Sequence, residues 1–412
     1  MISNEIFTFD GQRNAMQRDF SQNIIRLYII KVAKWFMLTM PIIMLFYKDL
    51  GLSHQEAFQL KAIYSISIVI FEVPSGYLAD ILGRKFTLVL GAVLGTLGFL
   101  FYSLGTGFWM FLAAEMTLGI GQSFISGSDS AMLFDSLKAD GRSHKYLKYE
   151  GLNFSIGNYS EALAGLAGGA LAEISLHLPF YFQTGIAFLG IPAALTLIEP
   201  PRIKKRKRPG FSDILKVIKH ALIQNNQLRW NLIYSSIIGT STLTMAWVYQ
   251  LKLQEFGFTE IFIGATATGL NLLVGTVTLF SSKLERKMGK RITILSTSII
   301  ITGGFVAAGF TDKALFFLPV LGIFYMARGI ATPVLKDYIN QITPSDIRAT
   351  VLSVRSLLIR AIFAVIAPLF GWISDTLSLS EALFIVGLVF MALALSTITL
   401  FLNTLKKKAL PD

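Results

Sequence analysis

One loop decides how this sequence folds: Gly76-Tyr77-Leu78-Ala79-Asp80-Ile81-Leu82-Gly83-Arg84-Lys85. It lies between two long apolar stretches and combines two glycines, a carboxylate and a closing basic pair. Glycine suits a point where the chain reverses or where backbones approach closely. A carboxylate at a membrane edge is costly unless it meets a positive partner. The stretch therefore predicts a tight turn between two membrane helices, with an acidic group that needs such a partner.

The composition of the chain excludes most classes of protein. Of its 412 residues, 53% are hydrophobic and 15% are charged, whereas about a quarter of a soluble domain is charged. A water-soluble fold of this length needs more polar residues to cover its surface, which excludes a soluble enzyme or a disordered scaffold. The chain has no cysteine, so disulfides, thiolate metal sites and a cysteine nucleophile are excluded. The remaining class is a polytopic membrane protein.

Twelve segments of the sequence are long and apolar enough to cross a membrane. A helix needs about 20 mostly apolar residues to span the hydrocarbon core, and glycine and proline are common inside such helices. We therefore expect an all-α fold with twelve transmembrane helices. The expected spans are 23–47, 56–80, 86–104, 108–134, 150–174, 178–198, 228–251, 260–281, 291–310, 314–338, 352–373 and 381–404.

Basic residues gather in alternate loops between these spans. The opposite loops carry only Lys48, Lys252 and Lys313. Since basic loops stay in the cytoplasm, both termini are expected to be cytoplasmic. The first 20 residues lack an apolar core and are not expected to form a signal peptide. The basic loops contain Arg84, Lys85, Lys138, Arg142, Lys145, Lys148, Arg202 to Arg208, Lys283 to Arg291, Arg348 and Lys406 to Lys408.

The chain divides into two similar halves. At an offset of 206 residues, Asp49–Ser53 matches Glu255–Thr259, and the loop quoted above matches Ser282–Arg291. Two matches at one offset favour duplication of a six-helix unit. The expected parts are a cytoplasmic N-terminal segment (1–22), a first six-helix bundle (23–198), a basic linker with a surface helix (199–227), a second six-helix bundle (228–404) and a cytoplasmic tail (405–412).

The loop between the second and third helices resembles the signature of the major facilitator superfamily, Gly-x-Leu-Ala-Asp-x-x-Gly-Arg-Lys. Three further stretches, Phe71–Gly76, Ser126–Ala131 and Arg348–Ser353, are similar to bacterial members of this superfamily. The resemblance covers the whole chain and is nearest to members of the drug:proton-antiporter type. It implies two bundles that rock about a central site.

The resemblance also implies a conformational latch that holds the outward-open state. Asp80 is expected to meet the amino-terminal end of the eleventh helix, where the helix dipole is positive and where Arg348 or Arg355 lies close. Arg84 can pair with an aspartate at the inner end of the fourth helix. The expected latch residues are Gly76, Asp80, Gly83, Arg84, Lys85 and Asp135.

The fifth helix leaves the direction of transport open. The antiporter signature of the superfamily, Gly-x8-Gly-x3-Gly-Pro-x2-Gly-Gly, is only partly present. Small residues persist, so that close helix packing is kept, but Gly165 replaces the proline. Export in exchange for protons is therefore suggested by the resemblance and not secured by this helix.

Ionisable residues within membrane spans indicate functional sites by default. Carboxylates in a low-dielectric cavity can take up a proton near neutral pH, and Glu161, near the membrane midplane, is our first choice for this role. The proton-coupling candidates are Glu161, Glu72, Glu115 and Asp129. The candidates for the substrate cavity are Lys34, Arg328, Arg360, Asn158, Tyr159, Trp247, Asn271 and Tyr325.

Simpler explanations remain for these residues. Glu161 can pair with Arg328 or Lys34 and merely hold helices together, and the aromatic residues can serve packing alone. The run from Lys204 to Arg208 is better explained by anionic lipid headgroups than by nucleic acid. The sequence shows no metal-ligand spacing and no Walker loop, so no metal, cofactor or ATP-driven pumping is expected.

The sequence predicts a secondary active transporter in a bacterial inner membrane, and not an enzyme. Its expected partners are a small-molecule substrate, protons and the lipid bilayer, and we expect a monomer. The favoured hypothesis is proton-coupled export of a small amphiphilic or organic-ion substrate. Symport or facilitated uptake of a polar nutrient is the alternative. A sensor without transport activity is a third hypothesis, disfavoured because tails and connector are short.

Overall fold

The computed structural model describes residues 20–201, 216–344 and 347–406, and in these residues every regular element is helical. The first half contains α2 (Ser21–Trp35), α3 (Ile43–Asp49), α4 (His54–Leu82), α5 (Arg84–Leu104), α6 (Phe108–Ile125), α7 (Ser128–Ala139), η1 (Ser143–Lys145), α8 (Tyr146–Ile174), α9 (Leu178–Phe188) and α10 (Gly190–Thr196). The second half contains η2 (His220–Gln224), α12 (Asn226–Glu255), α13 (Glu260–Met288), α14 (Lys290–Gly309), α15 (Ala314–Ile342), α16 (Arg348–Thr376) and α17 (Leu379–Lys406). Most of the expected N-terminal segment, the basic run of the linker and the tail from residue 407 lie outside the described residues.

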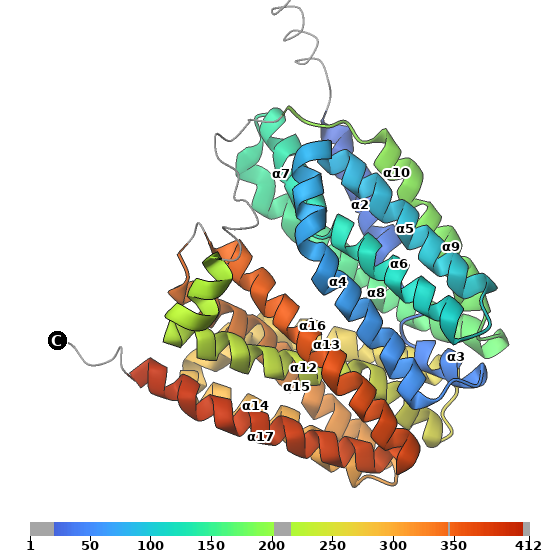
Figure 1. Cartoon of the computed structure of the whole chain (residues 1–412), viewed down its shortest axis with the longest axis vertical. Helices are drawn as coiled ribbons and strands as arrows, with labels where there is room; N and C mark the ends of the chain where they lie inside the picture. The colour runs from blue at the N-terminus through green and yellow to red at the C-terminus, as the bar shows by residue number, and fades with distance from the viewer. Residues whose placement is uncertain (1–19, 202–215, 345–346, 407–412) are drawn as a thin grey trace, which may run out of the picture.

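The helices form two bundles that face each other (Figure 1). In the first bundle α5 packs against α6 and α9, and in the second α14 packs against α15 and α17. Across the interface, α4 packs along α16 and α8 packs along α13. The predicted fold, two six-helix bundles in an all-α membrane protein, is confirmed.

The internal repeat is visible in the backbone conformation. Gly51 and Gly257, which are 206 residues apart, have φ angles of 80° and 79°. Gly83 and Gly289, at the same offset, both have positive φ angles, at 116° and 80°. Side-chain-bearing residues rarely adopt such angles, so both halves turn at glycine in equivalent places.

A side-chain contact repeats at this offset as well. Arg84 forms an ion pair with Asp135, as predicted. The equivalent residues of the second half, Lys290 and Gln341, are joined by a hydrogen bond of 2.8 Å between Nζ and Oε1. The second half therefore keeps the contact while it loses the carboxylate.

Nine helices among the described residues are long and apolar enough to span a membrane. The remaining three expected spans are the interrupted pair α2 and α3 and the more polar helices α8 and α12. The predicted continuous helix over 23–47 is wrong, since the helix is broken between Phe36 and Ile42. Pro41 lies in this break, lacks an amide hydrogen and disfavours helix at the residue before it.

Two other expected spans are also interrupted. The span expected over 108–134 breaks at Ser126 and Gly127 and then continues as α7 to Ala139, because Gly127 adopts a left-handed conformation with φ 75°. The sixth span breaks at Leu189. Pro192 cannot donate to the carbonyl of the residue four positions earlier, which accounts for the break.

The two ends of the molecule differ in how closely the bundles approach. We call the end with the Gly83 and Gly289 turns the motif end, and the other the opposite end. At the opposite end the bundles touch, because Asp375 accepts backbone hydrogen bonds from the first residues of α4 and Gly169 packs against the backbone of α13. From there α4 and α16 diverge toward the motif end (Figure 1).

Candidate functional site

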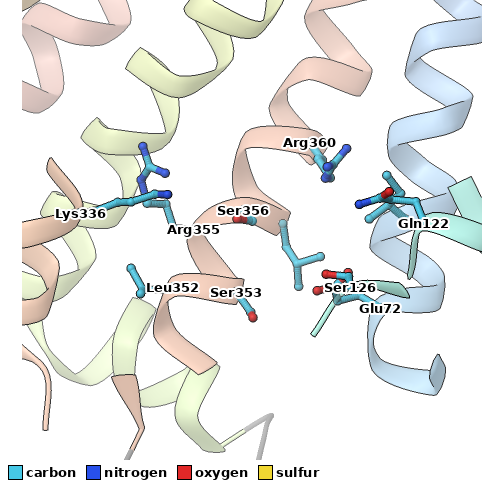
Figure 2. A pocket seen from close by; sticks show the side chains of 11 residues that line it. Glu72, Gln122, Ser126, Lys336, Leu352, Ser353, Arg355, Ser356 and Arg360 are labelled. Atoms are coloured by element: carbon cyan, nitrogen blue, oxygen red, sulfur yellow. The ribbon is translucent and has the colours of Figure 1, made fainter. Parts of the chain in front are cut away.

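A cavity of about 300 Å³ lies between the two bundles. Its walls come from α4 and α6 of the first bundle and from α15 and α16 of the second (Figure 2). Hydroxyl, amide and charged groups share the lining with aliphatic side chains. The lining residues are Ile68, Glu72, Gln122, Ser126, Lys336, Leu352, Ser353, Arg355, Ser356, Leu357 and Arg360.

The charged groups of this cavity are arranged around α16. In Figure 2, Lys336 and Arg355 lie beside one another, while Glu72 lies across α16 from them and Arg360 points toward Gln122. Arg355 is buried, and its guanidinium donates to the hydroxyl of Ser235 on α12. Arg360 carries its guanidinium 5.9 Å from the ring of Tyr64 on α4. Arg360 thus faces the first bundle across the cavity, whereas Arg355 is bonded within the second bundle.

Local sequence explains how Glu72 and Ser126 meet at the cavity. Ser75 donates to the carbonyl of Glu72 at 3.0 Å and to the carbonyl of Ser123 at 2.9 Å. The bond to Ser123 joins α4 to the end of α6, next to the break at Ser126 and Gly127. Two of the stretches that resembled the superfamily, Phe71–Gly76 and Ser126–Ala131, are therefore packed together at the cavity wall.

A second charged group lies on α2 and α7. Lys31 approaches Asp129 at 3.9 Å between Nζ and Oδ2. Lys34 interacts electrostatically with Asp129, Glu72 and Arg360. The predicted residues Lys34, Asp129, Glu72 and Arg360 therefore belong to one electrostatic network.

Glu161 lies at the contact between α8 and α13. Asn271 donates from Nδ2 to Glu161 Oε1 at 3.3 Å, and this hydrogen bond joins the two bundles. Arg328 interacts electrostatically with Glu161 and lies 5.2 Å from the ring of Tyr325. Among the residues that the structure describes, no ion pair within 4 Å involves Glu161. The structure brings together four predicted residues here, and Asn271 supplies the direct contact.

A buried ion pair occupies the first bundle near the opposite end. Lys61 pairs with Glu115, whose carboxylate also accepts hydrogen bonds from the hydroxyls of Tyr47 and Tyr102. The ammonium of Lys61 lies 4.8 Å from the ring of Trp247 on α12. Lys61 and Glu115 are 5% and 2% exposed. Glu115 is therefore held within the protein by an ion pair and two hydroxyl groups.

Of the eight predicted substrate-cavity residues, only Arg360 is among the described residues that line this cavity. Two of the others are exposed. Asn158 is exposed and donates to the carbonyl of Phe154 in its own helix at 3.1 Å. Tyr159 is 68% exposed. In the part of the chain that the structure describes, neither belongs to the lining of the cavity.

Two of the expected latch residues are paired with each other in the structure. Arg84 contacts Asp135 and the carbonyl of Ala131. Glu199, which the sequence analysis did not single out, accepts hydrogen bonds from the backbone of Arg84 and Lys85 at 3.0 and 2.7 Å. This carboxylate caps α5, as acidic groups do at the positive end of a helix.

Within the expected spans, sequence reasoning missed four polar residues that the structure makes prominent: Lys31, Lys61, Gln122 and Lys336. It named Arg355 only as a possible neighbour of Asp80. Each of these five residues lies inside an expected span. The rule that polar groups within membrane spans mark functional sites, applied to every such residue, would have found them.

A family model described as Major Facilitator Superfamily matches residues 27–368. The quinolone resistance protein NorA of Staphylococcus aureus (strain MSSA476) is 25% identical over 208 residues, which are 50% of this chain and 50% of that protein. The tetracycline resistance protein, class B, of Escherichia coli is 25% identical over 295 residues, which are 69% of this chain and 71% of that protein. The chain thus spans about half the length of the first of these relatives.

Among solved structures, that of the nucleoside transporter NupG has a TM-score of 0.77 and 14% sequence identity. The match covers 93% of this chain and 99% of that chain. At this identity the likeness shows the fold alone.

Proposed function

Because this chain belongs to the Major Facilitator Superfamily, a family of membrane transporters and not of enzymes, we propose that it exports a small amphiphilic or organic-ion substrate across a bacterial inner membrane in exchange for protons. Transport follows alternating access, in which residues 23–198 and 228–404 tilt past one another about the cavity. The protein works as a monomer within the lipid bilayer.

One observation carries this proposal: the bundles are joined at the opposite end and enclose a polar cavity between them. If the basic loops face the cytoplasm, both termini are cytoplasmic and the cavity belongs to an inward-open state. The substrate then enters from the cytoplasm. When the bundles close around the substrate at the motif end, α4 separates from the end of α16 and the cavity opens at the opposite end.

The latch acts in the second half of this cycle. In the structure, Arg355 is bonded to Ser235 and Arg348 donates to the carbonyl of Thr343 at 3.3 Å. We assign the contact between Asp80 and the start of α16 to the outward-open state. The ion pair of Arg84 with Asp135 positions the loop for that contact.

Proton coupling is assigned first to Glu161. Its only direct polar contact among the described residues is with Asn271 of the other bundle, so its charge state acts on the contact that must change during the cycle. Glu72, at the cavity wall, is the second choice. Asp129 and Glu115 already have cationic partners, so both rank after Glu72 as candidates for proton coupling.

The experiment is flux in vesicles that contain the purified chain. A panel comprises one amphiphilic cation, one organic anion and one nucleoside, each measured with and without a pH gradient. Export that accelerates when protons can flow inward supports the proposal. Flux that is unchanged after collapse of the gradient removes proton coupling, and proton-driven accumulation in the opposite direction supports uptake instead.

A further inference from the structure

We infer that the cavity binds the carboxylate or phosphate group of a small organic anion, and that Lys336 and Arg355 hold this group. The assignment of that anion as the transported substrate rests on the proposed function. The binding site itself rests on the geometry of the cavity in Figure 2.

The charge of the cavity lining favours an anion. Among its eleven residues are three cations, Lys336, Arg355 and Arg360, and one carboxylate, Glu72. Glu72 interacts electrostatically with Arg360, so that cation is already compensated in part. The excess positive charge therefore lies with Lys336 and Arg355, on the side of α16 away from Glu72.

These two cations lie together without a carboxylate. Lys336 interacts electrostatically with Arg355, and within the described residues neither forms an ion pair within 4 Å. Elsewhere in the membrane region Lys61 and Lys31 each have an acidic partner. A cation inside the membrane region is costly and is normally paired with a group of opposite charge. Lys34, Arg328 and Arg360 also form no ion pair within 4 Å among the described residues, but each interacts electrostatically with a carboxylate. Lys336 and Arg355 instead lie beside one another in the cavity lining (Figure 2), a place that a bound anion completes.

The remaining lining groups specify an organic anion. Ser353 and Ser356 place hydroxyl groups on the same helix, and hydroxyl groups can donate to an anion. A guanidinium and an ammonium recognise carboxylate or phosphate oxygens strongly. Leu352 and Leu357 provide aliphatic contacts for a hydrocarbon body. The volume of about 300 Å³ lies at the small end of ligand pockets.

The test is equilibrium binding of four aromatic probes to the purified full chain in detergent. Benzoate and phenyl phosphate carry the anionic group, benzamide is a neutral analogue and phenyltrimethylammonium is a cation. We expect benzoate or phenyl phosphate to bind at least tenfold more tightly than benzamide. The anion that binds more tightly identifies carboxylate or phosphate as the preferred group.

Three variants locate the site. Lys336→Gln removes the positive charge of a partly exposed side chain. It should therefore weaken binding of the preferred anion about tenfold and leave the affinity for benzamide unchanged. Arg360→Gln should have a smaller effect, and Lys313→Gln, in an exposed loop at the opposite end, should have none. The melting temperature of each variant shows whether it is folded. Arg355→Lys keeps the positive charge and should bind the anion more tightly than Arg355→Gln.

Three outcomes would overturn the inference. Benzoate and phenyl phosphate could bind no more tightly than benzamide, phenyltrimethylammonium could bind more tightly than the anions, or Lys336→Gln could bind the preferred anion with unchanged affinity. These outcomes are separable from failure of the proposed function. Anion binding that depends on Lys336 while flux ignores the pH gradient refutes proton coupling alone. Proton-driven flux of a cation without anion binding refutes the anion site alone.

Discussion

The carboxylate of Asp375, near the end of α16, accepts a hydrogen bond of 2.9 Å from the backbone N–H of His54, the first residue of α4. A second bond of 2.8 Å comes from the backbone of Gln55. The hydroxyl of Ser374 lies 2.7 Å from Nδ1 of His54. A residue of one bundle thus caps the helix of the other, where a negative group is favoured by the helix dipole. The opposite end is held closed by a contact that opening must break.

Asp375→Ala should shift the chain toward the outward-open state. Loss of a helix cap costs about 1 kcal/mol, which changes the ratio of two states about fivefold. The chain has no native cysteine, so Ser356→Cys in the cavity is a clean reporter for labelling from the motif end. Labelling should slow several-fold in Asp375→Ala. The matched control is Asp312→Asn, an exposed acidic residue at the same end, and equal labelling in both variants would rule out the cap as a gate.

Gly371→Ala should prevent closure of the opposite end. A Cβ at this position would lie 2.6 Å from Cα of Gln55 and 2.7 Å from the carbonyl oxygen of His54. Because these neighbours are backbone atoms, they cannot move aside without separating α4 from α16. We expect substrate flux to be lost and labelling of Ser356→Cys to fall, with expression retained.

The control for this variant is Gly303→Ala on α14, where an added Cβ meets nothing within 4 Å. Both changes raise helix propensity by about 1 kcal/mol, so the difference between them reports the clash. If Gly371→Ala transports as well as Gly303→Ala, the close approach of α4 and α16 is not required for the cycle.

The fold was predictable because its determinants are local or periodic. The turn at Gly83 and its copy at Gly289 follow from a motif, and the offset of 206 residues locates the equivalent turns at Gly51 and Gly257. The ion pair of Arg84 with Asp135 followed from the depth of both residues at the same membrane face. A motif, a repeat offset and the position of residues along their helices sufficed for these predictions.

The candidate site was only partly predictable, because its contacts join distant segments. Lys61 meets Glu115 only after α4 packs on α6, and Lys336 meets Arg355 only after α15 packs near α16. No local sequence pattern predicts which face of each helix is directed toward the cavity. Asn158 and Tyr159 were named for the cavity as a polar and an aromatic residue within a span, and residue type does not determine direction around a helix.

Glu161→Gln should abolish the dependence of flux on the pH gradient. Glutamine keeps a carbonyl oxygen that can accept the hydrogen bond from Asn271, but it cannot release or bind a proton. Flux down a substrate gradient should persist, since the contact between α8 and α13 is retained. Glu173→Gln, an exposed residue of the same helix, is the control. Persistent pH dependence in Glu161→Gln would move the assignment to Glu72, with Glu72→Gln as the next variant.

Lys61→Ala should lower stability more than the double variant Lys61→Met with Glu115→Gln. Removal of one partner leaves a buried carboxylate beside two tyrosine hydroxyls, and breaking a buried ion pair costs about 3–5 kcal/mol. The double variant removes both charges and keeps the volume of the site, so the loss should be smaller. Thermal unfolding in detergent measures both. A double variant less stable than Lys61→Ala would show that the charges themselves hold Tyr47 and Tyr102 in place.

Asp80→Asn should impair transport while membrane insertion stays intact. The change removes the negative charge that the proposed latch places against the positive start of α16, so the outward-open state loses stabilisation relative to the structure described here. Labelling of Ser356→Cys should therefore stay fast or become faster, opposite in direction to Asp375→Ala. Arg286→Gln, which alters the equivalent position of the second half, is the control, because that half lacks the carboxylate. Normal flux in Asp80→Asn, or slowed labelling, would refute the latch. In the combination of Asp80→Asn with Asp375→Ala, the two shifts should partly cancel, since each variant weakens the closed form of a different end.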